Sequence, residues 1–319
     1  MKIVILERGT IGPDVDVNVI GELGETVVYD NTEPEQVAER VKDAEIIVAN
    51  KCPLNDQTLK DAPLVRFIEE FATGYDNIDL EYCRSRNIGV ANVSDYSTPA
   101  VVQHTFALAL YLLEHLPHYD QYVKQGDYAA QSRFTYFGVP FMELAGKTWG
   151  IVGMGHIGQG VAAVAKAFGC DVIWYSTSGA HAVEGYRQVD FATLLKESDF
   201  LSLHCPLNEK THHLIDGAAL EQMKPTAILI NVARGKVVDN AALAKALQNG
   251  VIAAAGLDVV EAEPITADNP LNEIQDSNRL IITPHMAWAS VEARNRVVTE
   301  AYKNIEAFLK GEKRNRVDE

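Results

Sequence analysis

Three residues of this sequence, Arg234, Glu263 and His285, each follow an apolar, strand-like run. If those runs are parallel strands of one sheet, their carboxyl ends meet at one edge and bring the three side chains together. The guanidinium of Arg234 can then hold a carboxylate through two hydrogen bonds and polarise the carbonyl beside it. His285 can give a proton to that carbonyl oxygen, while Glu263 orients the imidazole and stabilises its charged form. The pattern predicts reduction of a 2-oxo acid, although each residue taken alone would favour a surface charge, a solvated loop acid or a packing histidine.

A glycine-rich turn indicates where the reducing cofactor would bind. Gly153, Gly155 and Gly158 form the pattern G-x-G-x-x-G between a strand-like run at 148–152 and a helical run at 159–168. In a dinucleotide site one glycine allows the tight turn, one lets the backbone approach the pyrophosphate, and one lets the helix pack against the strand. The phosphates then face unpaired N–H groups and the positive end of the helix dipole. The alternative is a turn without a ligand, but both flanks favour a dinucleotide.

The elements that must position these residues alternate between strands and helices in both halves of the chain. Strand-like runs lie at 3–6, 26–29, 46–49, 64–68 and 89–92, and then at 149–152, 171–175, 200–203, 227–231, 254–257 and 280–283. Strands separated by helices predict parallel sheets with helices on their faces. A long apolar helix over 99–116 should connect the halves, and an amphipathic helix over 290–310 should precede a polar tail, 311–319, that frays. We expect the active site in the cleft between the halves.

The composition is that of a soluble globular enzyme. The 319 residues are 47% hydrophobic and 23% charged, and a formal net charge of -16 disfavours nucleic acid and anionic membranes as partners. The apolar run at 3–6 is too short for a signal peptide or a membrane span, so we expect a cytoplasmic location. The four cysteines lack the paired spacing of a metal or redox site, and the adjacent His212 and His213 point in different directions. No metal is therefore expected.

Over essentially its whole length the sequence resembles the D-isomer-specific 2-hydroxyacid dehydrogenases. The resemblance lies in Ala-Thr-Gly-Tyr-Asp-Asn-Ile-Asp at 72–79, in Val-Gly-Met-Gly-His-Ile-Gly at 152–158 and in Thr-Pro-His at 283–285. The catalytic trio of that family is an arginine, a glutamate before a proline and a histidine after a proline. These positions match Arg234, Glu263 and His285, which implies an NAD(P)-dependent oxidoreductase with His285 as the acid/base.

The resemblance also implies the fold and its division into domains. It implies an α/β protein with two doubly wound parallel-sheet domains. A Rossmann dinucleotide-binding domain, 99–286, would be inserted into a discontinuous, flavodoxin-like substrate domain formed by 1–98 and 287–319. The family further implies a homodimer, with the segment 127–142 as an arm across the interface. Phe134, Tyr136, Phe137 and Phe141 would anchor that interface, although packing within one chain explains them equally well.

Further site residues are implied by the same resemblance. Asp258 would contact the carboxamide side of the nicotinamide, and the backbone of Thr73 and Gly74 would receive the substrate carboxylate beside Arg234 and His285. The full set of expected cofactor contacts is Gly153, Gly155, His156, Ile157, Gly158, Ser176, Thr177, Cys205, Pro206, Thr211, Val232, Ala233 and Asp258.

One position departs from the pattern of NAD-specific members, which carry an acid for the ribose 2′-hydroxyl at the end of the second strand. Ser176 stands there, followed by Thr177 and Ser178. The repulsion that would exclude a 2′-phosphate is missing, but no arginine follows at once, and His181 and Arg187 lie farther on. We expect NADP(H) to be used, with NAD(H) not excluded.

Two short segments bear on the choice of substrate. The segments at 72–75 and 287–290 look more like the glycerate dehydrogenase, or hydroxypyruvate reductase, branch than the D-lactate branch, which favours hydroxypyruvate or glyoxylate. Alternatively, Trp288 merely packs, and the enzyme acts on D-lactate or on bulkier acids. A formate dehydrogenase would carry glutamine in place of Glu263. A non-catalytic protein that senses dinucleotides is the alternative of another class, and the retained trio weighs against it.

Overall fold

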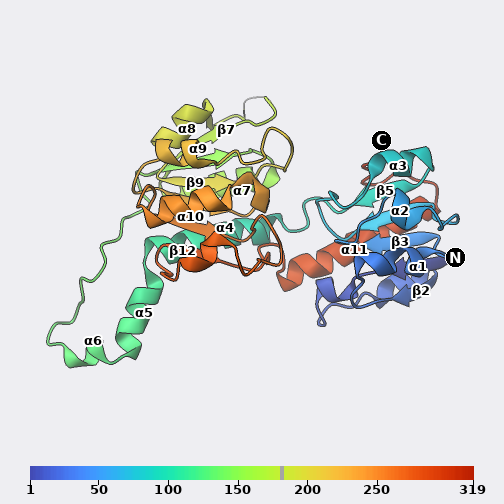
Figure 1. Cartoon of the computed structure of the whole chain (residues 1–319), viewed down its shortest axis with the longest axis horizontal. Helices are drawn as coiled ribbons and strands as arrows, with labels where there is room; N and C mark the ends of the chain where they lie inside the picture. Colours follow the sequence, from blue (N-terminus) through green and yellow to red (C-terminus); the bar gives the residue numbers. More distant parts are fainter. Residues whose placement is uncertain (180–182) are drawn as a thin grey trace. The chain divides into compact units, whose positions relative to one another are not determined.

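The computed structural model describes residues 1–179 and 183–319, which form two compact units (Figure 1). Unit 1 consists of Met1–Ser97 and Trp288–Glu319, and unit 2 consists of Thr98–Ala287. Each unit has its own parallel sheet with helices packed on it. The predicted α/β class with two parallel-sheet domains is confirmed.

Unit 1 is built on a five-stranded parallel sheet in the order β2-β1-β3-β4-β5, the flavodoxin-like order. Its strands are β1 (Lys2–Ile5), β2 (Glu25–Val28), β3 (Ile46–Ala49), β4 (Phe67–Glu70) and β5 (Gly89–Asn92). Its α-helices are α1 (Val37–Val41), α2 (Asp56–Leu59), α3 (Leu80–Ser85) and α11 (Val291–Leu309). The last helix returns the chain to this unit and packs on β4, where the rings of Phe67 and Phe308 stack with centroids 4.3 Å apart.

Two expectations for unit 1 were wrong. The strand expected at 64–68 is β4, which lies later and takes Glu69 and Glu70 into the fully buried part of the sheet. The tail expected to fray is ordered along β5: Val317 N donates to Val90 O at 3.0 Å, and Val90 N donates to the Asp318 carboxylate at 2.8 Å. An edge strand presents unpaired backbone groups, and the tail satisfies them.

Unit 2 is built on a seven-stranded parallel sheet in the order β12-β11-β10-β9-β6-β7-β8. Its strands are β6 (Thr148–Val152), β7 (Asp171–Tyr175), β8 (Arg187–Gln188), β9 (Phe200–Leu203), β10 (Ile228–Asn231), β11 (Ala254–Leu257) and β12 (Leu280–Ile282). Six of these strands were expected, and the two-residue edge strand β8 was missed because two residues carry no periodicity. Counted from β6, the order is that of a doubly wound dinucleotide-binding sheet with one added strand, β12.

Helices cover both faces of this sheet (Figure 1). On one face, α8 (Phe191–Glu197), α9 (Gly217–Gln222) and α10 (Asn240–Gln248) bury their leucines and alanines against the strands. On the other face, α4 (Thr98–Leu113) and α7 (His156–Ala167) pack around the fully buried Trp149. The sheet is therefore buried on both faces, and its strand ends are left to carry function.

The long helix expected over 99–116 is two helices. The first, α4, ends at Leu113, and α5 (Leu116–Lys124) begins after His115, whose φ of 50° is in the left-handed region. A non-glycine residue in that conformation cannot continue a right-handed helix. The chain then continues through the short helix α6 (Asp127–Ala130) before it enters β6. Within the described residues, no helix is both long and apolar enough to cross a lipid bilayer.

Candidate active site

The glycine turn lies between β6 and α7, as a dinucleotide site requires. Gly153 has a φ of 90°, and a side chain there would lie 2.9 Å from the carbonyl oxygen of His204. A Cβ on Gly158 would lie 2.1 Å from the carbonyl oxygen of Gly153, so the helix can approach the turn only without a side chain. A Cβ on Gly155, by contrast, would have no atom within 4 Å, which leaves open space before the first turn of α7. Gly153 and Gly158 thus have the expected turn and close-packing geometry, and approach of the pyrophosphate to Gly155 stays a prediction.

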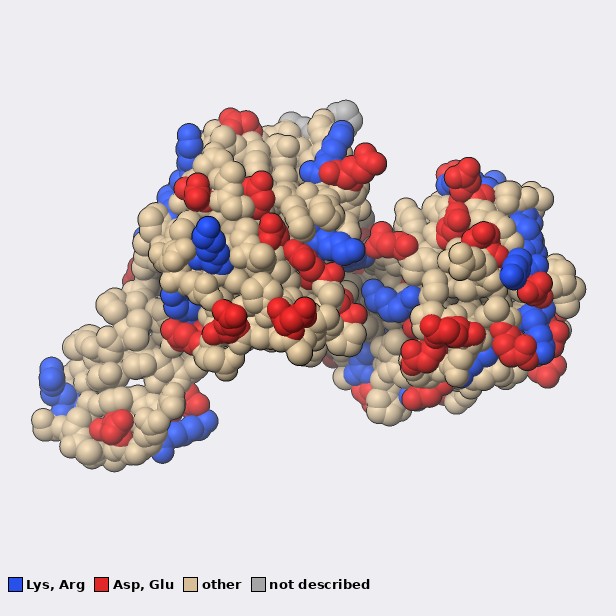
Figure 2. Space-filling model, viewed as in Figure 1, with Lys and Arg blue, Asp and Glu red and all other residues tan. Residues whose placement is uncertain are grey.

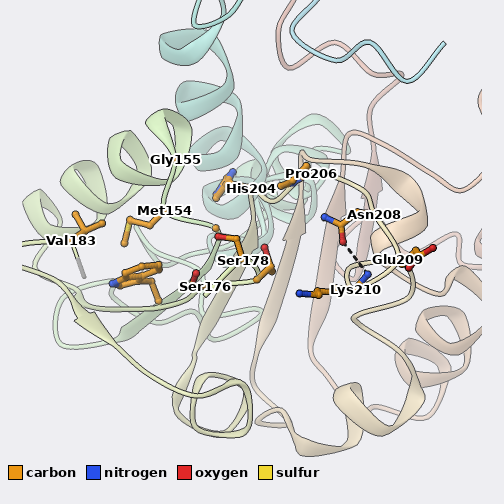
Figure 3. Close-up of a pocket in the computed structure, with 13 residues that line it drawn as sticks. Met154, Gly155, Ser176, Ser178, Val183, His204, Pro206, Asn208, Glu209 and Lys210 are labelled. Atoms are coloured by element: carbon orange, nitrogen blue, oxygen red, sulfur yellow. Dashed lines mark hydrogen bonds between the residues drawn. The ribbon is translucent and has the colours of Figure 1, made fainter. Parts of the chain in front are cut away.

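A cavity of about 760 Å³ opens beside this turn (Figure 3). It is lined by Gly153, Met154, Gly155, Trp174, Ser176, Thr177, Ser178, Val183, His204, Pro206, Asn208, Glu209 and Lys210. Apart from Val183, which precedes β8, these residues come from the turn, from the end of β7 and from the segment after β9, at the carboxyl ends of three neighbouring strands. Volume, strand ends and the N-terminus of α7 fit an adenine dinucleotide, whose phosphates the helix N–H groups would hold.

Five of the expected cofactor residues line this cavity, namely Gly153, Gly155, Ser176, Thr177 and Pro206. The others lie outside its lining: His156, Ile157 and Gly158 begin α7, Val232 and Ala233 follow β10, and Asp258 follows β11. Cys205 and Thr211 are buried, and burial raises the pKa of the Cys205 thiol to about 11. His181 lies outside the described residues.

Two lining residues that the sequence reasoning missed have buried polar atoms aimed at no protein group. Both ring nitrogens of His204, and the indole nitrogen of Trp174, are buried without a hydrogen-bond partner among the described residues. Burial lowers the pKa of His204 to about 3, so its ring is neutral at physiological pH. Buried polar atoms left unpaired are costly, which favours a ligand that supplies their partners. The signal for His204 was its place directly after β9.

The predicted acid/base pair is assembled in unit 2. Nδ1 of His285 lies 2.7 Å from Oε2 of Glu263, whose other oxygen accepts the backbone N–H of Val260 at 3.1 Å. The two side chains remain 26% and 34% exposed, so a substrate can reach them. Because Glu263 holds Nδ1, Nε2 is the ring nitrogen that can exchange a proton with a substrate.

The loop that carries Arg234 contacts the loop that carries Glu263 through a glycine. The side chain of Asn231 donates to the carbonyl oxygen of Arg234 at 3.0 Å and accepts from Ala233 N at 3.0 Å, which closes the turn after β10. A Cβ on Gly235 would lie 1.9 Å from the carbonyl oxygen of Val260, so the loop that carries Glu263 rests directly on this glycine. The loops of Arg234 and Glu263 are therefore interlocked.

A buried carboxylate holds the segment around His285. Asp258, only 2% exposed, accepts the backbone N–H groups of Met286 and Ala287 at 2.9 and 2.8 Å and the Thr283 hydroxyl at 2.6 Å. The same hydroxyl lies 2.9 Å from Nε2 of His104 on α4. His285 itself has a φ of 52°, and its N–H donates to the carbonyl oxygen of Asp258 at 2.8 Å. The surrounding hydrogen bonds keep His285 in this sparsely populated conformation.

The two expected substrate-binding residues of unit 1 lie in the loop after β4. The Thr73 hydroxyl donates to Val93 O at 3.0 Å, and the side chain of Asn92 donates to Thr73 O at 2.6 Å. The carbonyl and the hydroxyl of Thr73 therefore hold the loop in shape. The backbone N–H groups of Thr73 and Gly74 are the ones expected to bind the substrate carboxylate. Trp288, in the same unit, packs edge-on against Tyr96 with ring centroids 6.2 Å apart.

Known proteins resemble this chain over most of its length. Residues 106–287 match the family model described as D-isomer specific 2-hydroxyacid dehydrogenase, NAD binding domain. The chain is 38% identical over 317 residues to a hydroxypyruvate reductase of Blautia hydrogenotrophica, covering 98% of each protein. It is 37% identical over 318 residues to a glycerate dehydrogenase of Methylorubrum extorquens, covering 99% of each.

A solved structure extends the likeness to the fold. The NADPH-dependent glyoxylate/hydroxypyruvate reductase of Sinorhizobium meliloti, in complex with NADP and malonate, superimposes with a TM-score of 0.83 at 30% identity, over 99% of this chain and 96% of that one. The sequence and the fold thus point to the same family. The chain belongs to the D-isomer specific 2-hydroxyacid dehydrogenase family and is an oxidoreductase with a nicotinamide dinucleotide as cofactor.

Proposed function

We propose that the protein reduces hydroxypyruvate or glyoxylate to the D-2-hydroxy acid (or to glycolate) at the expense of NADH or NADPH. The observation that carries the proposal is the 2.7 Å contact between His285 Nδ1 and Glu263 Oε2, in a loop interlocked with that of Arg234. The hydroxypyruvate reductase and glycerate dehydrogenase among its relatives support this substrate class over D-lactate.

The chain's own residues would divide the reaction as follows. The reduced nicotinamide supplies a hydride to the carbonyl carbon. Arg234 binds the substrate carboxylate through two parallel hydrogen bonds and so orients the adjacent carbonyl. The imidazolium of His285 stabilises the charge that grows on the carbonyl oxygen and delivers its Nε2 proton there, which completes the hydroxyl group. Glu263 keeps the ring oriented and stabilises its charged form. The backbone N–H groups of Thr73 and Gly74 would complete the carboxylate site.

Kinetics with both cofactors test the proposal. Oxidation of NADH or NADPH is followed with hydroxypyruvate, glyoxylate, pyruvate and a bulkier 2-oxo acid. We expect the highest kcat/KM with hydroxypyruvate or glyoxylate. A preference for pyruvate or the bulkier acid would favour the D-lactate-type alternative. Tight cofactor binding without turnover of any 2-oxo acid would instead favour a dinucleotide sensor.

We also propose that the protein acts as a homodimer through an arm, defined here as residues 116–143. The arm packs on itself: the rings of Tyr122 and Tyr136 stack with centroids 3.8 Å apart, and the Tyr119 hydroxyl donates to Val139 O at 2.6 Å. Its helix α5 has no buried residue, while Phe134 and Phe137 are 90% and 85% exposed. Large aromatic side chains gathered in this way are typical of an interface core, and a second copy of the chain would cover them.

A further inference from the structure

The cofactor cavity has three adjacent hydroxyl side chains where an NAD-specific enzyme has an acid. Ser176, Thr177 and Ser178 follow β7 and all line the cavity. Ser176 and Thr177 are half-buried, and Ser178 is exposed. In a doubly wound sheet this strand end faces the ribose of the adenosine, so these hydroxyls lie where the 2′ substituent would be.

A lysine from a different strand end lines the same cavity. Lys210 follows β9, and within the described part of the chain it is the only Lys or Arg among the lining residues. Its loop is tightly built: the Thr211 hydroxyl donates to Pro206 O at 2.7 Å and accepts from Asn208 N at 2.8 Å, and Lys210 N donates to the Asn208 side chain at 2.9 Å. The backbone that presents Lys210 is thus held in place.

Among the residues that the structure describes, no acid forms an ion pair with Lys210. Lys224 lies 2.8 Å from Asp199, and Arg187, the cation nearest in sequence to the three hydroxyls, is paired with Glu197. Lys210 has no such carboxylate partner among the described residues. Elsewhere, basic and acidic side chains are interspersed on the face seen in Figure 2. In Figure 3 the amine of Lys210 points toward the side of the cavity with Ser178, and the carboxylate of Glu209 points away from it.

We propose that Lys210 and the hydroxyls of Ser176, Thr177 and Ser178 form a binding site for the 2′-phosphate of NADPH. The inference rests on the proposed dinucleotide-dependent function and adds the residue that selects the cofactor. A 2′-phosphate carries up to two negative charges and accepts several hydrogen bonds, which an ammonium and three hydroxyls can supply. In a protein with a net charge of -16, a local cation is needed to hold such a group.

Binding of two nucleotides that differ only in the 2′-phosphate tests this assignment without turnover. Isothermal titration of the whole protein compares 2′,5′-ADP with 5′-AMP, in the parent and in Lys210→Gln. We expect the parent to bind 2′,5′-ADP more tightly than 5′-AMP. The variant should lose about tenfold in affinity for 2′,5′-ADP, as for one exposed charge-assisted contact, and keep its affinity for 5′-AMP. Lys196→Gln removes the same charge from an exposed site on α8 and should change neither.

The outcomes separate this inference from the proposed function. If 5′-AMP binds but Lys210→Gln leaves the affinity for 2′,5′-ADP unchanged, or weakens both ligands alike, the phosphate site is wrong and dinucleotide binding stands. If neither nucleotide binds to the parent, both proposals fail. Added salt should reduce the preference for 2′,5′-ADP in the parent more than in Lys210→Gln, because exposed charges are screened.

Steady-state kinetics supply a second, independent readout. Lys210→Gln should lower kcat/KM for NADPH about tenfold and leave that for NADH unchanged. Ser176→Asp places an acid where the 2′-hydroxyl of NADH would be bound and the 2′-phosphate repelled, so it should shift the preference further toward NADH. An unchanged ratio of the two cofactors in both variants would overturn the assignment.

Discussion

At the scale of single residues, the site depends on how each polar atom is occupied. Glu263 uses one oxygen for Nδ1 of His285 and the other for a backbone N–H, so the carboxylate cannot turn away from the ring. Asp258 is occupied in the same way by three donors around His285. These hydrogen bonds show that Asp258 holds the segment around His285. Contact between Asp258 and the nicotinamide stays a prediction.

Replacing His285 tests whether it donates the proton while Arg234 binds the substrate carboxylate. His285→Asn should lower kcat by roughly a hundredfold or more, since general acid catalysis is lost. KM for the 2-oxo acid should change much less, because Arg234 still binds the carboxylate. Steady-state kinetics with varied concentrations of the 2-oxo acid measures both effects. His212→Asn, at an exposed position, is the control. A rise in KM as large as the fall in kcat would contradict these roles.

At the scale of elements, the candidate site consists of loops that contact one another at the carboxyl end of the unit 2 sheet. The loop after β10 supplies Arg234 and Gly235, and the loop after β11 rests on that glycine and supplies Glu263. The segment after β12 supplies His285 and is tied to Asp258. A small change in one loop should therefore displace groups in the others.

Gly235→Ala tests this interlocking. The added Cβ would overlap the carbonyl oxygen of Val260, because their separation would be 1.9 Å, so the loop that carries Glu263 must shift. We expect a loss of about 1–3 kcal/mol in the free energy of unfolding, as for overpacking, together with a lower kcat. Gly217→Ala is the matched control, since its Cβ would meet nothing closer than 3.9 Å. Urea unfolding and kinetics measure the two effects, and equal behaviour of the two variants would argue against the lock.

Strand β4 makes a separate prediction about stability. Glu69 is fully buried there, and desolvation raises the pKa of its carboxyl well above its ordinary value, although Asn304 donates to it at 2.9 Å. The folded protein therefore holds this proton more tightly than the unfolded chain does. The contribution of the protonated Glu69 carboxyl to the free energy of unfolding is fully present below the pKa of an unfolded glutamate, about 4.3. It is lost as the pH rises through the raised pKa.

Glu69→Gln should remove that dependence, because an amide stays neutral and still accepts the hydrogen bond from Asn304. Relative to the parent, the variant should gain about 1–3 kcal/mol in the free energy of unfolding at pH 8.5 and less at pH 5. Urea unfolding at the two pH values measures the difference. The exposed Glu312→Gln should show no such change with pH, and a Glu69→Gln gain that is the same at both values would contradict the argument.

At the scale of the whole molecule, the exposed aromatics of the arm predict association of two chains. Phe134→Ser combined with Phe137→Ser removes the two most exposed aromatic side chains. In light scattering after size exclusion, the parent should have twice the mass of the chain, and the double variant should have the mass of one chain or dissociate at higher concentration. Leu64→Ser, an equally nonpolar-to-polar change at a residue 56% exposed in unit 1, should leave the mass unchanged. A parent that is monomeric would refute the homodimer.

The sequence by itself determined the features that short stretches of chain specify. The spacing of Gly153, Gly155 and Gly158 between an apolar strand and a helix predicted the turn, because these glycines solve local steric problems. The alternation of strands and helices predicted two parallel sheets, because each of these elements is also specified by a short stretch of chain. The position of Arg234, Glu263 and His285 after strands predicted that they would lie at one edge, since parallel strands end together.

Only the tertiary structure decided what depends on segments far apart in the chain. It placed Lys210 on the same cavity as the hydroxyls after β7, paired the C-terminal tail with β5, and buried Glu69 beneath α11. None of these has a local signature: a lysine in a loop, a polar tail and a glutamate at the end of an apolar run each read as solvated. Burial and the neighbours across the fold set their chemistry, and those are properties of the packed chain rather than of any short stretch of it.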